Sequence, residues 1–133
     1  MILIAIALAA LPTVPGAVNP AVTQTNIAAT ICVRGWAAHQ RPPLSYTERL
    51  KRKAAHGRKL SLFEYDHVIP IELGGDPMSS ANLWLEPKRE AAKKDKLENR
   101  LHALVCSDAL ELTAAQHEIA TDWITSYRMR VGK

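Results

Sequence analysis

Residues 64–75 read EYDHVIPIELGG, and residues 82–84 read NLW. Large apolar and polar side chains alternate over the first positions of this stretch, as they do in a short β-strand. Pro70 and the pair Gly74-Gly75 then end the strand and predict a long loop. Residues 82–85 form a second short strand candidate. The segment therefore predicts two short strands joined by a loop.

Helical patterns lie on both sides of these strands. Ahead of them, residues 46–56 are predicted to form a helix that the capping box Ser45-x-x-Glu48 begins and Gly57 ends. After them, Pro87 begins a helix whose apolar positions follow helical spacing up to Cys106, at Leu97, Leu101, Leu104 and Val105. This order of elements predicts an α+β domain with very little sheet.

A last helix is predicted after a second capping box, Thr113-x-x-Gln116. Its apolar residues form one stripe at helical spacing. We interpret the stripe as core rather than as a binding site: Ile119, Ala120, Trp123, Ile124 and Tyr127.

The N-terminal residues read differently from the rest of the chain. Residues 1–17 combine an apolar run of roughly ten residues with prolines and small residues, the order of a secretory signal peptide. Ala7-Leu8-Ala9 and Pro15-Gly16-Ala17 both present small residues to a signal peptidase. The run is too short to span a membrane, so we expect no stable membrane insertion after its removal. Residues 18–44 show no sustained period and are predicted as a loosely ordered arm, which precedes a domain of residues 45–133.

The two cysteines agree with an exported, periplasmic or secreted protein. Cys32 lies in the arm and Cys106 at the end of the long helix, and an exported domain meets an oxidising compartment. A disulfide between them would close a loop of roughly 75 residues and stabilise the fold by about 4 kcal/mol. Two buried free thiols are the alternative.

The chain is basic, with 17 Lys and Arg residues against 13 Asp and Glu residues, a formal net charge of +4. A positive charge favours polyanionic partners. Basic runs are often only solvated faces, and the case for nucleic acid depends on the residues between them. The candidate nucleic-acid-binding residues are Lys51, Arg52, Lys88, Arg89, Lys93 and Lys94.

The order Asp66-His67, Pro70, Gly74-Gly75 and Asn82-Leu83 resembles the motif of HNH endonucleases, the ββα-metal nucleases. The resemblance covers residues 62–106 and is closest to small exported HNH proteins of the bacterial type. It implies a small ββα-metal core with flanking helices and the N-terminal arm. Paired CxxC motifs, a Gly-x-Ser-x-Gly elbow and a phosphate loop are all missing from the sequence.

The resemblance also implies roles for three residues. His67 would be the general base that activates water, which suits the titration of imidazole near neutral pH. Asp66 would be the first metal ligand. Asn82 would hold the Gly-rich loop against the strands and so orient His67. A carboxylate ligand favours Mg²⁺, with Mn²⁺ or another transition metal left open.

The sequence departs from the family pattern on the helix after Pro87. Many members carry a His or Asn there as a further ligand, whereas this chain has Ala91 and Ala92. Side chains that can replace it lie one turn further on, on one side of the helix: Asp95, Glu98, Asn99 and His102. We take Asp95 first and Glu98 second as metal ligands. Ordinary surface pairing with neighbouring Lys and Arg residues is the competing interpretation.

These features predict a metal-dependent endonuclease that hydrolyses phosphodiester bonds in DNA, or in RNA, with low sequence specificity. Two other functions stay open. The chain could be a catalytically degenerate HNH-like module that only binds nucleic acid, for which Ala91 and Ala92 speak. It could also be a structural or interaction protein of the cell envelope, in which Asp66, His67 and Asn82 brace a loop.

Overall fold

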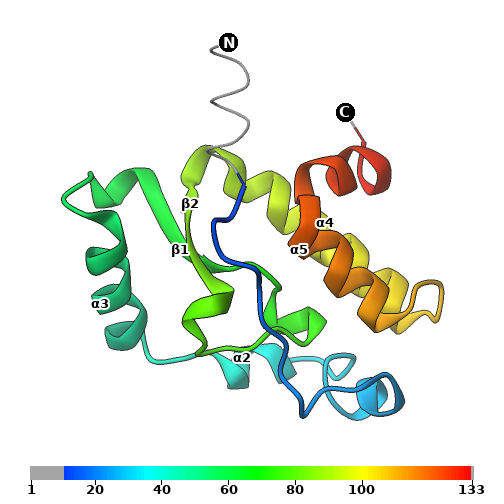
Figure 1. Ribbon diagram of the computed structural model, residues 1–133. Coiled ribbons are helices and arrows are strands. Elements are labelled where there is room, and N and C mark those ends of the chain that lie inside the picture. Colours follow the sequence, from blue (N-terminus) through cyan, green and yellow to red (C-terminus); the bar gives the residue numbers. More distant parts are fainter. Residues whose placement is uncertain (1–10, 133) are drawn as a thin grey trace.

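The structure is a computed structural model that describes residues 11–132. Helices surround one small sheet, and short 3₁₀ turns (η) connect them (Figure 1). In chain order the elements are η1 (Gln24–Ala29), α2 (Trp36–Gln40), α3 (Leu44–Ala55), η2 (Leu60–Leu62), β1 (Phe63–His67), η3 (Ile71–Leu73), η4 (Ser80–Asn82), β2 (Leu83–Pro87), α4 (Lys88–Cys106) and α5 (Leu112–Arg130).

Strands β1 and β2 pair antiparallel, with Phe63 opposite Pro87 and His67 opposite Leu83. Helix α3 lies on one side of this hairpin, while α4 and α5 pack together on the other side (Figure 1). The prediction of a mixed α+β domain with very little sheet is confirmed. Strand β2 begins one residue later than predicted, because Asn82 belongs to the turn η4.

Both predicted capping boxes are wrong. Helix α3 begins at Leu44 after Pro43, and no side chain caps its first turn. Helix α5 begins at Leu112, and Gln116 instead donates a hydrogen bond of 2.8 Å to the carbonyl oxygen of Leu73. In α5 a tertiary contact therefore uses the Gln116 side chain that the local motif would have used.

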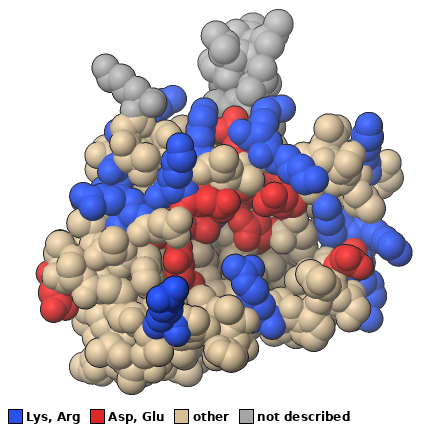
Figure 2. Space-filling model, turned by 180° about the vertical axis from the view of Figure 1, so that it is seen from behind, with Lys and Arg blue, Asp and Glu red and all other residues tan. Residues whose placement is uncertain are grey.

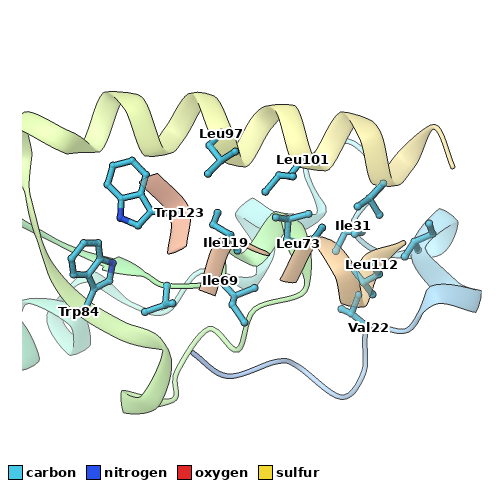
Figure 3. Packing of buried hydrophobic residues seen from close by; sticks show 14 residues of the cluster. Val22, Ile31, Ile69, Leu73, Trp84, Leu97, Leu101, Leu112, Ile119 and Trp123 are labelled. Atoms are coloured by element: carbon cyan, nitrogen blue, oxygen red, sulfur yellow. The ribbon is translucent and has the colours of Figure 1, made fainter. Parts of the chain in front are cut away.

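The core lies between α4, α5 and the loop after β1. Leu97, Leu101 and Val105 of α4 are fully buried against Ile119 and Trp123 of α5 (Figure 3). This confirms that the stripe on the last helix is core. The remaining stripe residues are partly buried and pack against the same cluster: Ala120, Ile124 and Tyr127.

The N-terminal arm is part of this core rather than loosely ordered. Val22, Ile27 and Ile31 are buried in the central cluster, so the prediction of a loose segment is wrong for these residues. The arm escaped sequence analysis because it folds into 3₁₀ turns and a short helix, which bury apolar residues without a regular period. Residues 11–17 of the expected leader also pack on the domain, and residues 1–10 lie outside the described residues.

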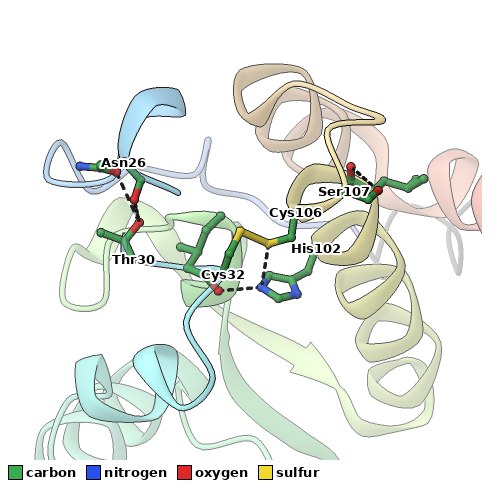
Figure 4. The surroundings of a disulfide bond; sticks show 8 residues. Asn26, Thr30, Cys32, His102, Cys106 and Ser107 are labelled. Atoms are coloured by element: carbon green, nitrogen blue, oxygen red, sulfur yellow. Dashed lines mark hydrogen bonds between the residues drawn. A yellow bond between two sulfur atoms is a disulfide. The ribbon is translucent and has the colours of Figure 1, made fainter. Parts of the chain in front are cut away.

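Cys32 and Cys106 form the predicted disulfide and close a sequence separation of 74 residues. His102 lies beside it, and its Nε2 is 2.8 Å from the carbonyl oxygen of Ile31 (Figure 4). The bridge therefore fixes the arm to the end of α4. In the described part of the chain, every helix is too short or too polar to cross a membrane.

Candidate active site

Strand β1 ends with Asp66 and His67, the pair at the centre of the motif. The Oδ1 of Asp66 accepts a hydrogen bond of 2.8 Å from the backbone N–H of His67. The same oxygen lies 3.8 Å from Nδ1 of the His67 ring. His67 is 8% exposed, so its ring is held in place while one edge still borders a pocket.

The other ring nitrogen of His67 determines its tautomer. Nε2 lies 3.0 Å from the carbonyl oxygen of Pro77, an atom that can only accept a hydrogen bond. Nε2 therefore carries the hydrogen, and Nδ1 of a neutral ring has a free lone pair. Since Nδ1 faces Asp66, the proton acceptor lies beside the carboxylate that would stabilise an imidazolium ion.

Asn82 is completely buried and makes four hydrogen bonds. Its Oδ1 accepts from the backbone N–H groups of Ile69 and Ala17, and its Nδ2 donates to the carbonyl oxygens of Ile69 and Asp76. A Cβ at Gly75 would lie 1.8 Å from the carbonyl oxygen of Ile69, so this close approach requires glycine. The amide thus ties the loop to the strands, as the sequence predicts for it.

Helix α4 brings two carboxylates to Asp66. One oxygen each from Asp66, Asp95 and Glu98 lies within 4.8 Å of the others. These residues and His67 line a pocket of about 300 Å³. Ala91 is buried and Ala92 is exposed, and neither lines this pocket. The structure therefore brings together the acidic side chains that the sequence singled out.

Lys94 requires a correction, because its side chain is completely buried and cannot bind nucleic acid. Its ammonium group donates hydrogen bonds of 2.9 Å to the carbonyl oxygen of His67 and 2.7 Å to Oε2 of Glu98. Glu98 therefore does pair with a neighbouring lysine, as the competing interpretation predicts, but this pair is buried rather than at the surface. Lys94 positions the end of β1 and neutralises part of the acidic cluster.

Burial and mutual repulsion set the charges of the cluster. Burial would raise the pKa of Asp66, but the ring of His67 in its protonated form, the charge of Lys94 and the backbone N–H of His67 lower it below its ordinary value. Burial raises the pKa of Glu98 to about 7, against the opposing effect of Lys94. Burial and the charge of Asp66 also raise the pKa of Asp95. Asp66 is therefore the carboxylate best kept ionised.

Three further residues line the pocket with these carboxylates. Arg41 follows α2, Glu72 lies in η3 and Asn99 lies on α4. Sequence analysis missed Arg41 and Glu72, and it considered Asn99 only as a substitute ligand. Neither Arg41 nor Glu72 belongs to a periodic pattern or to the motif. Burial raises the pKa of Glu72, while the charges of His102 and Arg41 lower it.

The other predicted nucleic-acid-binding residues lie at the surface. Arg52, Lys88, Arg89 and Lys93 are exposed and Lys51 is half-buried, on α3 and the first turns of α4. Figure 2 shows acidic side chains gathered near the middle of one face, with Lys and Arg side chains around them.

A larger cavity of about 850 Å³ lies on the other face of the hairpin, among Phe63, Tyr65 and Leu85. It has no acidic side chain in its lining, which is mostly apolar. Of these two cavities in the described residues, the smaller is therefore the better candidate for metal-dependent chemistry, because it combines carboxylates with a histidine.

The chain was compared with protein-family models, with curated proteins and with solved structures, and none of the three comparisons found a match.

Proposed function

We propose that this protein is an exported, metal-dependent endonuclease of the HNH type that hydrolyses phosphodiester bonds in DNA or RNA with low sequence specificity. One observation carries the proposal. His67 and Asp66 at the end of β1 meet Asp95 and Glu98 of α4 around a single pocket. Such a hydrolysis needs a general base and carboxylates that can bind a metal ion, and this pocket contains both.

The order of elements supports the same function. An antiparallel hairpin with a long loop is followed directly by a helix whose first half faces the hairpin. The motif residues Asp66, His67 and Asn82 lie on the hairpin and its loop, and Asp95 lies on the helix. This order agrees with the ββα arrangement that the resemblance to HNH endonucleases implies, and it supports the proposal.

The donor set suits a hard divalent cation. Asp66 and Asp95 supply carboxylate oxygens, and Glu98 has a second oxygen beyond the one that pairs with Lys94. Oxygen ligands of this kind favour Mg²⁺ or Mn²⁺ over Zn²⁺. When bound, such a cation would neutralise charge on the phosphate and on the leaving oxygen.

His67 is assigned the proton transfer. Its Nδ1 takes a proton from a water molecule, and the water oxygen forms a bond to phosphorus while the bond from phosphorus to the leaving oxygen breaks. The carbonyl oxygen of Pro77 keeps the ring oriented through Nε2. Asp66, 3.8 Å from Nδ1, stabilises the imidazolium that results.

Binding of the polyanion is assigned to the cationic side chains. Arg41 lines the pocket itself, so its guanidinium group can hold a phosphate there. The exposed residues Arg52, Lys88, Arg89 and Lys93 would contact the backbone further away. Contacts to phosphates carry no base information, which explains the low sequence specificity of the proposal.

Export is part of the proposal, and the disulfide between Cys32 and Cys106 supports it. Disulfides persist in oxidising compartments and are rare in a reducing cytoplasm. The apolar run at the N-terminus fits a leader.

The test is cleavage of plasmid DNA and of RNA by the purified, oxidised protein in Mg²⁺, Mn²⁺ or excess EDTA. We expect cutting that needs the metal and falls by at least about 10²-fold in His67→Ala. His117→Ala is the matched control, because His117 is exposed on α5 and lies outside the pocket.

Full activity in a folded His67→Ala protein would refute the assignment of the base. Salt-sensitive binding of nucleic acid without cutting in any metal would support the degenerate binding module instead. Failure to bind either metal or nucleic acid would favour a structural role in the cell envelope.

A further inference from the structure

A second group of carboxylates adjoins the pocket on the hairpin itself. Glu64 and Glu86 are paired across the strands, and Glu64 and Asp66 point to the same face of β1. One oxygen each from Glu64, Asp66 and Glu86 lies within 4.8 Å of the others. Asp66 therefore belongs to this group as well as to the group with Asp95 and Glu98.

Glu86 distinguishes this group from an ordinary acidic surface. Its side chain is 0% exposed, and within residues 11–132 neither of its carboxylate oxygens has a hydrogen-bond partner. The nearby ammonium of Lys94 is used by His67 and Glu98. An ionised, buried carboxylate without a partner is strongly unfavourable, so Glu86 is either protonated or neutralised by a bound cation.

We propose that Glu64, Asp66 and Glu86 bind a second divalent cation, with Asp66 shared between the two ions. The oxygen-only donor set again selects Mg²⁺ or Mn²⁺. Glu64 is exposed, so the ion can enter from solvent along the edge of the hairpin, while Glu86 holds it from the buried side.

The net charge of the two carboxylate groups is what two divalent cations would neutralise. Together they contain five carboxylates, Glu64, Asp66, Glu86, Asp95 and Glu98, and one ammonium group, that of Lys94. If all were ionised, their net charge would be −4, which two divalent ions would neutralise. A single divalent ion at the pocket would leave Glu86 facing ionised neighbours without a partner.

This inference rests on the proposed function only for the ion at Asp95. A measurement of metal binding can therefore test the second site separately from the proposed function. The experiment measures bound Mn²⁺ by equilibrium dialysis of the oxidised protein, with electron paramagnetic resonance of the bound ions. We expect two Mn²⁺ ions per chain in the wild type, one in Glu86→Gln, one in Asp95→Asn and none in Asp66→Asn. The signal of the wild type should be broadened by coupling between the two ions, and Glu86→Gln should remove the broadening.

Two further variants serve as a control and as a second test of the site. Glu48→Gln removes an exposed carboxylate on α3, outside both groups, and should keep two ions. Glu64→Gln replaces an exposed side chain and should bind one ion even if Glu86→Gln does not fold.

One ion in the wild type that Glu86→Gln and Glu64→Gln retain and Asp95→Asn loses would overturn the second site and leave the proposed function intact. One ion that is lost in Glu86→Gln but kept in Asp95→Asn would uphold the second site and contradict the ligand set of the proposed function. Absence of any bound Mn²⁺ would overturn both.

Discussion

The two halves of helix α4 bury very different side chains on one continuous stripe. From the second turn to the middle of the helix the stripe contains Lys94 and Glu98, which are joined by an ion pair of 2.7 Å. Near its end the stripe contains Leu101 and Val105, and Cys106 is bonded to Cys32. The first half faces the hairpin and its carboxylates, whereas the second half faces α5 and the arm.

This comparison predicts that the activity and the stability of the protein depend on different parts of helix α4. Buried apolar side chains and a long-range disulfide stabilise a fold directly. A buried ion pair often stabilises it no better than apolar residues of similar size, because both charges lose their hydration. We therefore expect the end of α4 to determine the free energy of unfolding, and its beginning to determine the activity.

The largest effect on stability is expected from the disulfide. Replacing Cys32 and Cys106 together by serine should lower the free energy of unfolding by about 4 kcal/mol, because the unfolded chain regains the freedom of a long loop. Urea unfolding followed by circular dichroism measures the change. Reduction of the wild type should reproduce it, and an unchanged midpoint in both would contradict a stabilising bridge.

The apolar end of the stripe comes next. Leu101→Ala should lower the free energy of unfolding by about 3 kcal/mol, because Leu101 is completely buried in the central cluster. Cleavage measured well below the unfolding temperature should stay near that of the wild type. Leu104→Ala is the control, since Leu104 is only half-buried and should lose less stability. Equal losses would show that burial on α4 does not determine stability.

The ionic beginning of the stripe should respond in the opposite way. We expect the double variant Lys94→Met/Glu98→Leu to unfold with an unchanged free energy or one raised by about 1 kcal/mol. Its cleavage activity should fall roughly 10²-fold, because the carbonyl oxygen of His67 loses the donor that positions it and the proposed cation loses the Glu98 carboxylate. Lys94→Met alone should be less stable than the double variant. Full activity in the double variant would show that neither Lys94 nor Glu98 contributes to the proposed reaction.

The smallest effect on stability is expected from an ion pair on helix α5, outside both halves of α4. Helix α5 is kinked at Asp122, and Glu118 spans the kink by accepting hydrogen bonds from Arg130 and Ser126. The hydrogen bond from Arg130 lowers the pKa of Glu118 below its ordinary value. Its contribution, below about 1 kcal/mol, should be present above the ordinary glutamate pKa and disappear as the pH falls through the lowered value.

Glu118→Gln tests this contribution. Thermal unfolding should show the variant less stable than the wild type near pH 7 and equal to it near pH 2. A difference that persists in acid would assign the effect to packing instead.

Sequence analysis succeeded where a pattern is local. The motif located Asp66, His67 and Asn82, and helical spacing put Asp95 on the side of α4 that reaches Asp66. It failed for Arg41, because a distant segment brings this residue to the pocket. It failed for Glu72, because this residue lies inside the motif segment but at none of the motif positions. The spacing of apolar residues on α4 also indicates that Lys94 is buried. Lys94 lies three residues before Leu97 and seven before Leu101, on the apolar stripe itself.

If the protein is exported and cleaved as proposed, the hydrogen bond from the N–H of Ala17 to Asn82 would link its maturation to the candidate active site. A signal peptidase that cut after Ala17 would remove this hydrogen bond together with the one from the N–H of Gly16 to the carbonyl oxygen of Ala81, and the chain would then begin at Val18. A cut after Ala9 would retain both contacts. The choice between the two processing sites would thereby decide whether the mature protein keeps the N-terminal segment hydrogen-bonded to Asn82 in the loop of the candidate active site.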